Sequence, residues 1–134
     1  MHIIIKFLIS FIVFLSIDLL WLGIIARKLY VHYMGHLLRT PPNWPVAFLF
    51  YGLFVVGIMI FAIEPAVQQK NIAHAAKWGA LFGFFTYMTY DLTNWAVLKD
   101  WPSGIVGIDI LWGTVLAMSV ATASTYIILT LSGS

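Results

Sequence analysis

The stretch that decides the fold lies near the end of the chain and reads IVGIDILWGTVLAMSVATASTYIILTL over residues 105–131, with Asp109 as its single charge. A helix needs about 20 mostly apolar residues to cross the hydrocarbon core of a bilayer, because each residue adds about 1.5 Å along the axis. Residues 3–26, 44–63 and 78–98 are comparable apolar stretches. The sequence therefore predicts four membrane-spanning helices.

The composition of the whole chain agrees with this interpretation. Of its 134 residues, 62% are hydrophobic and only 9% are charged, whereas about 25% are charged in an ordinary soluble domain. So few charges cannot give a soluble protein its polar surface or keep a chain disordered. The formal net charge of +2 is too small for a nucleic-acid-binding surface. We expect an all-α integral membrane four-helix bundle that forms a single domain over residues 1–134. The absence of cysteine excludes disulfides and thiolate ligands.

The loop between the first two predicted spans has a helical pattern of its own. Its apolar residues, among them Tyr30 and Met34, recur at helical spacing, while His32 and His36 lie on a more polar stripe. This pattern is typical of a short amphipathic helix in the membrane interface, ended here by Pro41-Pro42.

Small residues recur every four positions in the last two predicted spans. Gly79 and Gly83 form one such pair, and Gly113, Ala117 and Ala121 form a longer row. Small side chains let helix backbones approach closely in lipid. The sequence leaves open whether they pack within one chain or between two copies.

Three of the five acidic residues fall inside the predicted spans: Asp18, Asp91 and Asp109. Each costs about 2.5–3.5 kcal/mol near the centre of a membrane helix, so such residues usually face a polar interior and mark a functional site. The first and third spans run toward the first loop, and the fourth starts at that side. All three aspartates therefore lie in the same half of the bilayer.

Other polar and aromatic side chains are expected at the same depth. Tyr87, Asp91 and Asn94 share a helix face because they are spaced by three or four residues. We therefore expect a polar pocket that is closed toward the termini and nearest to water at the first loop. The candidate ligand-binding residues are Asp18, Trp21, His36, Tyr87, Tyr90, Asp91, Asn94, Asp109 and Trp112.

Two of the aspartates lie in similar local sequences. Residues 16–21 (SIDLLW) and 107–112 (GIDILW) are identical at four of six positions, with tryptophan three residues after aspartate in both. The match does not extend further and the two helices run in opposite directions, so independent origins are the simpler interpretation.

Several functions fit this acidic pocket. The aspartates could fix helix packing only, as in a structural or accessory membrane subunit. They could instead form a site for a small ligand or a lipid, with Asp18, Asp91 and Asp109 as candidate catalytic groups. With His36 they could also hold a divalent metal, since carboxylates suit hard cations. A proton-coupled small transporter is a further alternative. Whether the protein is an enzyme is left open.

Several short motifs along the chain resemble those of a family of small bacterial membrane proteins. This family is known only as a domain of unknown function. The resemblance covers most of the chain and is carried by residues 17–23, 35–38, 79–83, 90–94, 101–102 and 109–114. It implies four spans and a multi-pass location in the bacterial cytoplasmic (inner) membrane, but no activity or cofactor. The expected partners are the lipid bilayer and an unidentified small-molecule or lipid ligand, without nucleic acid. A second copy of the chain is left open as a further partner.

Overall fold

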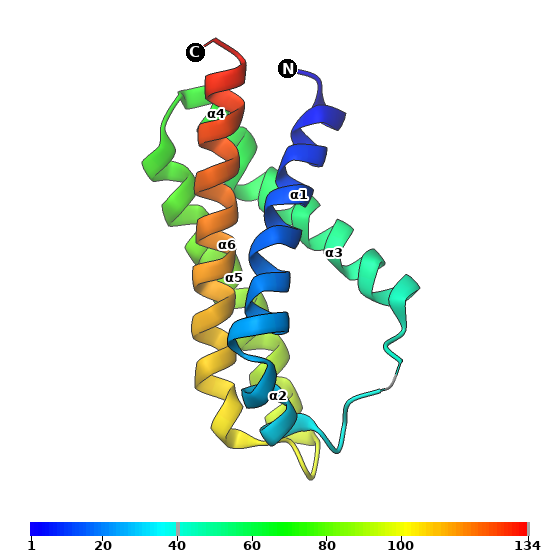
Figure 1. Ribbon diagram of the computed structural model, residues 1–134. Helices are drawn as coiled ribbons and strands as arrows, with labels where there is room; N and C mark the ends of the chain where they lie inside the picture. Colours follow the sequence, from blue (N-terminus) through cyan, green and yellow to red (C-terminus); the bar gives the residue numbers. More distant parts are fainter. Residues whose placement is uncertain (40, 134) are drawn as a thin grey trace.

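The computed structural model describes residues 1–39 and 41–133, and all regular secondary structure in these ranges is helical. Both termini lie at one end of the molecule, which we call the terminal end, and α2 lies at the other, which we call the loop end (Figure 1). The elements follow in the order α1 (Ile3–Leu20), η1 (Trp21–Ile25, a π-helix), α2 (Arg27–Met34), α3 (Trp44–Ile58), η2 (Met59–Ile63, a π-helix), α4 (Glu64–Gln69), α5 (Ile72–Val97) and α6 (Ser103–Leu131).

Polar side chains begin several of these helices. The side chain of Asn43 accepts a hydrogen bond from the backbone N–H of Val46, and that of Asn71 accepts one from His74. Such caps satisfy backbone donors that have no partner in the first turn of a helix. Between α4 and α5 the chain turns at Lys70, which adopts a left-handed conformation with φ of 51°.

Proline explains the π-helical turn in the second long helix. Pro65 lies in the first turn of α4, directly after the π-helical turn η2. Proline lacks a backbone N–H and its ring clashes with the carbonyl four residues earlier, so a continuous α-helix cannot pass through it unchanged. The wider π-helical turn accommodates the proline, and α3, η2 and α4 continue as one helix over Trp44–Gln69.

The helices α5 and α6 form the most extensive contact in the molecule. A Cβ atom on Gly79 would lie 2.8 Å from the Cβ of Ala121, and one on Gly83 would lie 2.7 Å from the Cβ of Ala117. The predicted small-residue seam therefore lies within one chain. Each step of four residues along α5 moves four residues back along α6, which is an antiparallel register.

Three helices are long and apolar enough to cross a membrane: Ile3–Ile25, Trp44–Gln69 and Ser103–Leu131. They match three of the four expected spans. The remaining expected span, residues 78–98, corresponds to α5. Over the described residues, α5 is not apolar enough to be counted with the other three. α5 is less apolar because its carboxyl-terminal half contains polar residues such as Asp91 and Asn94. The fold is thus all-α with three long apolar helices, and the expected four-helix membrane bundle is supported only in part.

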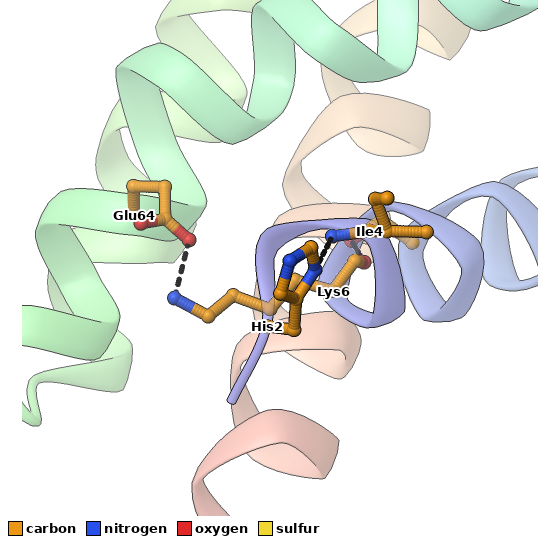
Figure 2. A network of polar contacts seen from close by, with 5 residues as sticks. His2, Ile4, Lys6 and Glu64 are labelled. Atoms are coloured by element: carbon orange, nitrogen blue, oxygen red, sulfur yellow. Dashed lines mark hydrogen bonds and ion pairs between the residues drawn. The ribbon is translucent and has the colours of Figure 1, made fainter.

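The terminal end is tightly packed. Phe14, Ile58, Ala62 and Val120 are fully buried there and belong to one apolar cluster between α1, α3 with η2, and α6. Figure 2 shows the Lys6 ammonium group beside Glu64, with the Nζ and Oε1 atoms 2.9 Å apart. This is the only ion pair in the described part of the chain, so none of Asp18, Asp91 and Asp109 is paired with a cation there.

Candidate functional site

A cavity of about 620 Å³ lies toward the loop end, between α1 and the other long helices. Figure 1 shows α3 leaning away from α1 as it approaches that end, and side chains of both helices line the space. The lining residues are Asp18, Leu22, Tyr30, Met34, Leu38, Ala47, Phe50, Tyr51, Phe54, Thr86, Tyr87, Tyr90, Trp101, Asp109 and Trp112. The walls are therefore mostly apolar and aromatic, with two carboxyl groups among them.

Both carboxyl groups are held by hydrogen bonds from aromatic side chains. The Tyr30 hydroxyl donates to Oδ1 of Asp109 at 2.7 Å, and Nε1 of Trp112 donates to Oδ1 of Asp18 at 3.4 Å. Asp18 is only 6% exposed and Asp109 only 9%. Both bonds join different helices, so they fix the positions of the acids relative to one another.

The two similar sequence motifs meet in this site. The indole rings of Trp21 and Trp112 stack with centroids 4.3 Å apart and planes 9° apart. Trp112 donates to Asp18 of the other motif, and Trp21 donates at 3.3 Å to the Tyr30 hydroxyl that in turn reaches Asp109. Each motif's tryptophan thus supports the other motif's aspartate, once directly and once through Tyr30.

Tyr30 is held in its protonated form by these surroundings. Burial and the neighbouring Asp109 carboxylate raise the pKa of the Tyr30 phenol above its usual range. The hydroxyl therefore remains a hydrogen-bond donor at any physiological pH. Tyr30 lies on α2, so this short helix contributes to the site as well as covering the loop end.

Asp91 lies outside the cavity, in the interface between α5 and α6. The register that pairs Gly83 with Ala117 and Tyr87 with Gly113 brings Asp91 opposite Asp109, and the two carboxyl groups interact electrostatically. Asp91 is fully buried, and neither of its carboxylate oxygens has a hydrogen-bond partner within the described part of the chain. An unpartnered buried carboxyl group is unusual and typically has a functional reason.

The structure brings some of the sequence-predicted site residues together and separates others. The predicted residues that line the cavity are Asp18, Tyr87, Tyr90, Asp109 and Trp112. Trp21 does not line the cavity but stacks on Trp112, which does. Asp91 lies outside the cavity, opposite Asp109 in the interface between α5 and α6. Asn94 is half-buried on α5 and His36 is exposed, and neither lines the cavity.

The first loop presents its apolar face to the site instead of its polar stripe. Tyr30 and Met34 line the cavity. The side chain of His32 is exposed, and Nε2 of His36 lies 3.3 Å from the backbone oxygen of Asp100. The amphipathic pattern could have identified Tyr30 as a site residue, but it is equally typical of a tyrosine that anchors a helix at the membrane surface.

The expected metal ligands do not come together. Over the described residues, no group of three or more His, Cys, Asp or Glu side chains is arranged to hold a metal ion. His36 in particular is not part of the acidic site. The geometry therefore gives no support to a metal held by Asp18, Asp91, Asp109 and His36.

A comparison with known protein families gives a match over residues 3–126 to a family described as predicted membrane protein (DUF2177). The chain belongs to the DUF2177 family. This agrees with the family resemblance seen in the sequence, and the DUF2177 chain is a multi-pass membrane protein with buried aspartates. No curated protein and no solved structure matches it.

Proposed function

We propose that this protein binds a small amphiphilic molecule or a lipid in the cavity at its loop end. The observation that carries the proposal is the cavity itself, because its volume of about 620 Å³ lies within the range of about 300–1,000 Å³ typical of small-molecule sites. Aspartates that served only to hold helices together would be expected in packed interfaces. Asp18 and Asp109 instead line an open space.

Access to the cavity from the lipid phase also supports this function. Phe50 and Leu22 line the cavity and are 47% and 38% exposed. A molecule with an apolar chain can therefore enter between η1 and α3 without leaving the hydrocarbon layer. Its polar group would then lie near Asp18 and Asp109, which are also the groups able to exchange a proton with it.

Filling the cavity tests the proposal. Protein extracted from its membrane in a mild nonionic detergent would be analysed by native mass spectrometry, with one bound lipid-like molecule expected per chain. Ala47→Trp should abolish retention, because Ala47 lines the cavity. Ala96→Trp is the matched control, because Ala96 is exposed near the same end and does not line it. Equal retention by both variants would contradict the proposal.

The proposal includes α5 as a fourth membrane span, in the bacterial cytoplasmic membrane that the family resemblance implies. α5 packs antiparallel along α6, which is long and apolar enough to cross a membrane. Its 26 residues reach about 39 Å, more than the hydrocarbon thickness of about 30 Å. Because the chain has no cysteine, Gln69→Cys and Lys99→Cys can be labelled with an impermeant maleimide. Labelling from opposite sides is expected, and same-side labelling would contradict it.

A proton-coupled transporter is a second candidate, and Asp91 is the observation that favours it. Two buried carboxyl groups facing each other are most stable when they hold one proton between them. Loss or gain of that proton would change the charge beside the cavity. In proteoliposomes with a pH gradient, Asp91→Asn should then abolish proton movement while the cavity still binds its ligand. Equal proton movement with and without Asp91 would exclude this role.

A further inference from the structure

We infer that the molecule bound in the cavity carries a protonated amine head group on a single apolar chain. This inference rests on the proposed function, since it specifies what the same cavity selects. Two carboxyl groups, Asp18 and Asp109, line the cavity, and no Lys, Arg or His does so among the described residues. The polar part of the site is therefore acidic only.

This one-sided charge excludes the commonest anionic head groups. A phosphate or a fatty-acid carboxylate placed between Asp18 and Asp109 would be repelled and would find no cation to pair with it. Of the basic residues at the loop end, Arg27, Lys28 and His32 line a separate surface hollow that contains neither aspartate. A cation is the charge that this cavity complements.

The aromatic lining favours the same ligand. Tyr30, Tyr87, Tyr90 and Trp112 line the cavity together with the two acids. Trp112 is hydrogen-bonded to Asp18 and Tyr30 to Asp109. The faces of tyrosine and tryptophan rings attract cations, and the attraction grows when the site is shielded from water. Rings beside a carboxylate thus form a pocket for an ammonium group, whose N–H bonds can reach the carboxylate oxygens that Tyr30 and Trp112 leave free.

The volume and the wall chemistry limit the rest of the ligand. About 620 Å³ is the size of a site for a drug-sized molecule and suits one chain better than the two chains of a phospholipid. Leu22, Ala47 and Phe50 form the apolar part of the wall on the η1 and α3 side. The chain of the ligand would lie along these residues and extend toward lipid.

Three probes with the same chain test the inference: dodecylammonium, dodecanol and dodecyl sulfate. Each is added to delipidated protein in a nonionic detergent, and occupancy is measured by native mass spectrometry. We expect dodecylammonium to bind at least about tenfold more tightly than dodecanol, as one charge-assisted hydrogen bond would give. Dodecyl sulfate should show no saturable binding.

Variants assign the selectivity to the two carboxyl groups. Asp18→Asn combined with Asp109→Asn should reduce dodecylammonium binding to the level of dodecanol binding measured on the same variant. Asp100→Asn is the matched control, because Asp100 is exposed and outside the cavity. If the double variant does not fold, Asp18→Asn alone is used, since an amide still accepts the Trp112 hydrogen bond, and a partial loss of selectivity is expected.

The outcomes separate this inference from the proposed function. Equal binding of dodecylammonium and dodecanol, blocked by Ala47→Trp, would overturn the amine head group and leave the cavity as a binding site. Binding that Ala47→Trp does not reduce, or the absence of binding by all three probes, would overturn both.

Discussion

The two ends of this molecule use the same long helices in different ways. At the terminal end, α5 and α6 touch through Gly79 and Ala121, and Ile58, Ala62 and Val120 are fully buried. At the loop end, α3 leans away from α1 (Figure 1). A cavity lined by aromatic rings and two carboxyl groups lies there. Helix packing is thus closed where side chains are small and apolar, and it opens where large rings and acids replace them.

The polar groups at the two ends also differ in their partners. At the terminal end, the Ser10 hydroxyl donates to the backbone oxygen of Lys6 in its own helix at 2.8 Å. At the loop end, Asp18 and Asp109 receive their hydrogen bonds from other helices. Polar bonds within one helix do not position its neighbours. The polar contact between helices at the terminal end is the Lys6–Glu64 ion pair, which remains partly accessible to water. We therefore expect polar contacts between helices to position the loop end more strongly than the terminal end, and the variants below test this difference.

The largest loss of stability is expected from introducing a side chain at the tightest backbone contact between α5 and α6. Gly83→Leu introduces a side chain where even a Cβ atom would contact the Gly113 carbonyl oxygen and lie 2.7 Å from the Cβ of Ala117. Overpacking typically costs about 1–3 kcal/mol, and a contact with backbone has little room to relax, so we expect a loss of at least about 3 kcal/mol. Thermal unfolding in detergent measures it. Gly107→Leu, at a site with nothing within 4 Å, should change little, and equal melting temperatures would contradict the packed register.

The next largest effect is expected at the loop end. Tyr30→Phe removes the donor to Asp109 and the acceptor for Trp21, and leaves a buried carboxyl group without its partner. Such a loss costs about 1–3 kcal/mol, measurable as a lower free energy of unfolding. Tyr33→Phe is the control, because the Tyr33 hydroxyl makes no hydrogen bond within the described part of the chain. Equal losses in the two variants would remove the special role of Tyr30.

A gain in stability is expected when the unpartnered acid is neutralised. Asp91→Asn places an amide donor opposite Asp109 and removes a carboxyl group that has no hydrogen-bond partner. We expect the free energy of unfolding to rise by about 1 kcal/mol, the usual net worth of one hydrogen bond. Asp100→Asn, in an exposed turn, should have no effect. A clear decrease in the free energy of unfolding of Asp91→Asn would instead support the alternative in which the aspartates serve helix packing alone.

The smallest effect is expected at the terminal end. Lys6→Met breaks the ion pair with Glu64 (Figure 2). The side chain of Lys6 is 13% exposed and that of Glu64 is 26% exposed. Ion pairs that remain partly accessible to water contribute about 0–1 kcal/mol. A double-mutant cycle with Glu64→Gln isolates this contribution. A coupling as large as the loss from Tyr30→Phe would mean that charge positions both ends of the molecule.

The sequence predicts the helices well because their apolar lengths are long and unambiguous. Residues 3–26 were expected as a span, and the continuous helix covers Ile3–Ile25. The seam of Gly79 and Gly83 was also expected, since spacing by four residues places small side chains on one face. Both features depend on local sequence alone.

The site was predictable only in part because its shape depends on distant residues. The common depth of Asp18, Asp91 and Asp109 follows from span direction, but their separation into two cavity residues and one interface residue does not. That separation depends on helix rotation and on how α3 leans relative to α1 (Figure 1). Tyr30 was missed as a ligand residue because the pattern of α2 does not say which partner its apolar face meets.

The close seam between α5 and α6 has a consequence for how the protein is made. α5 is the least apolar of the long helices, so it gains little from entering lipid by itself. It leaves the ribosome before α6 and becomes favourable in the bilayer only when the glycine seam can join it to that helix. In the four-span arrangement proposed above, the two helices therefore insert together as a hairpin, and Asp91 crosses into the membrane already covered by its neighbour.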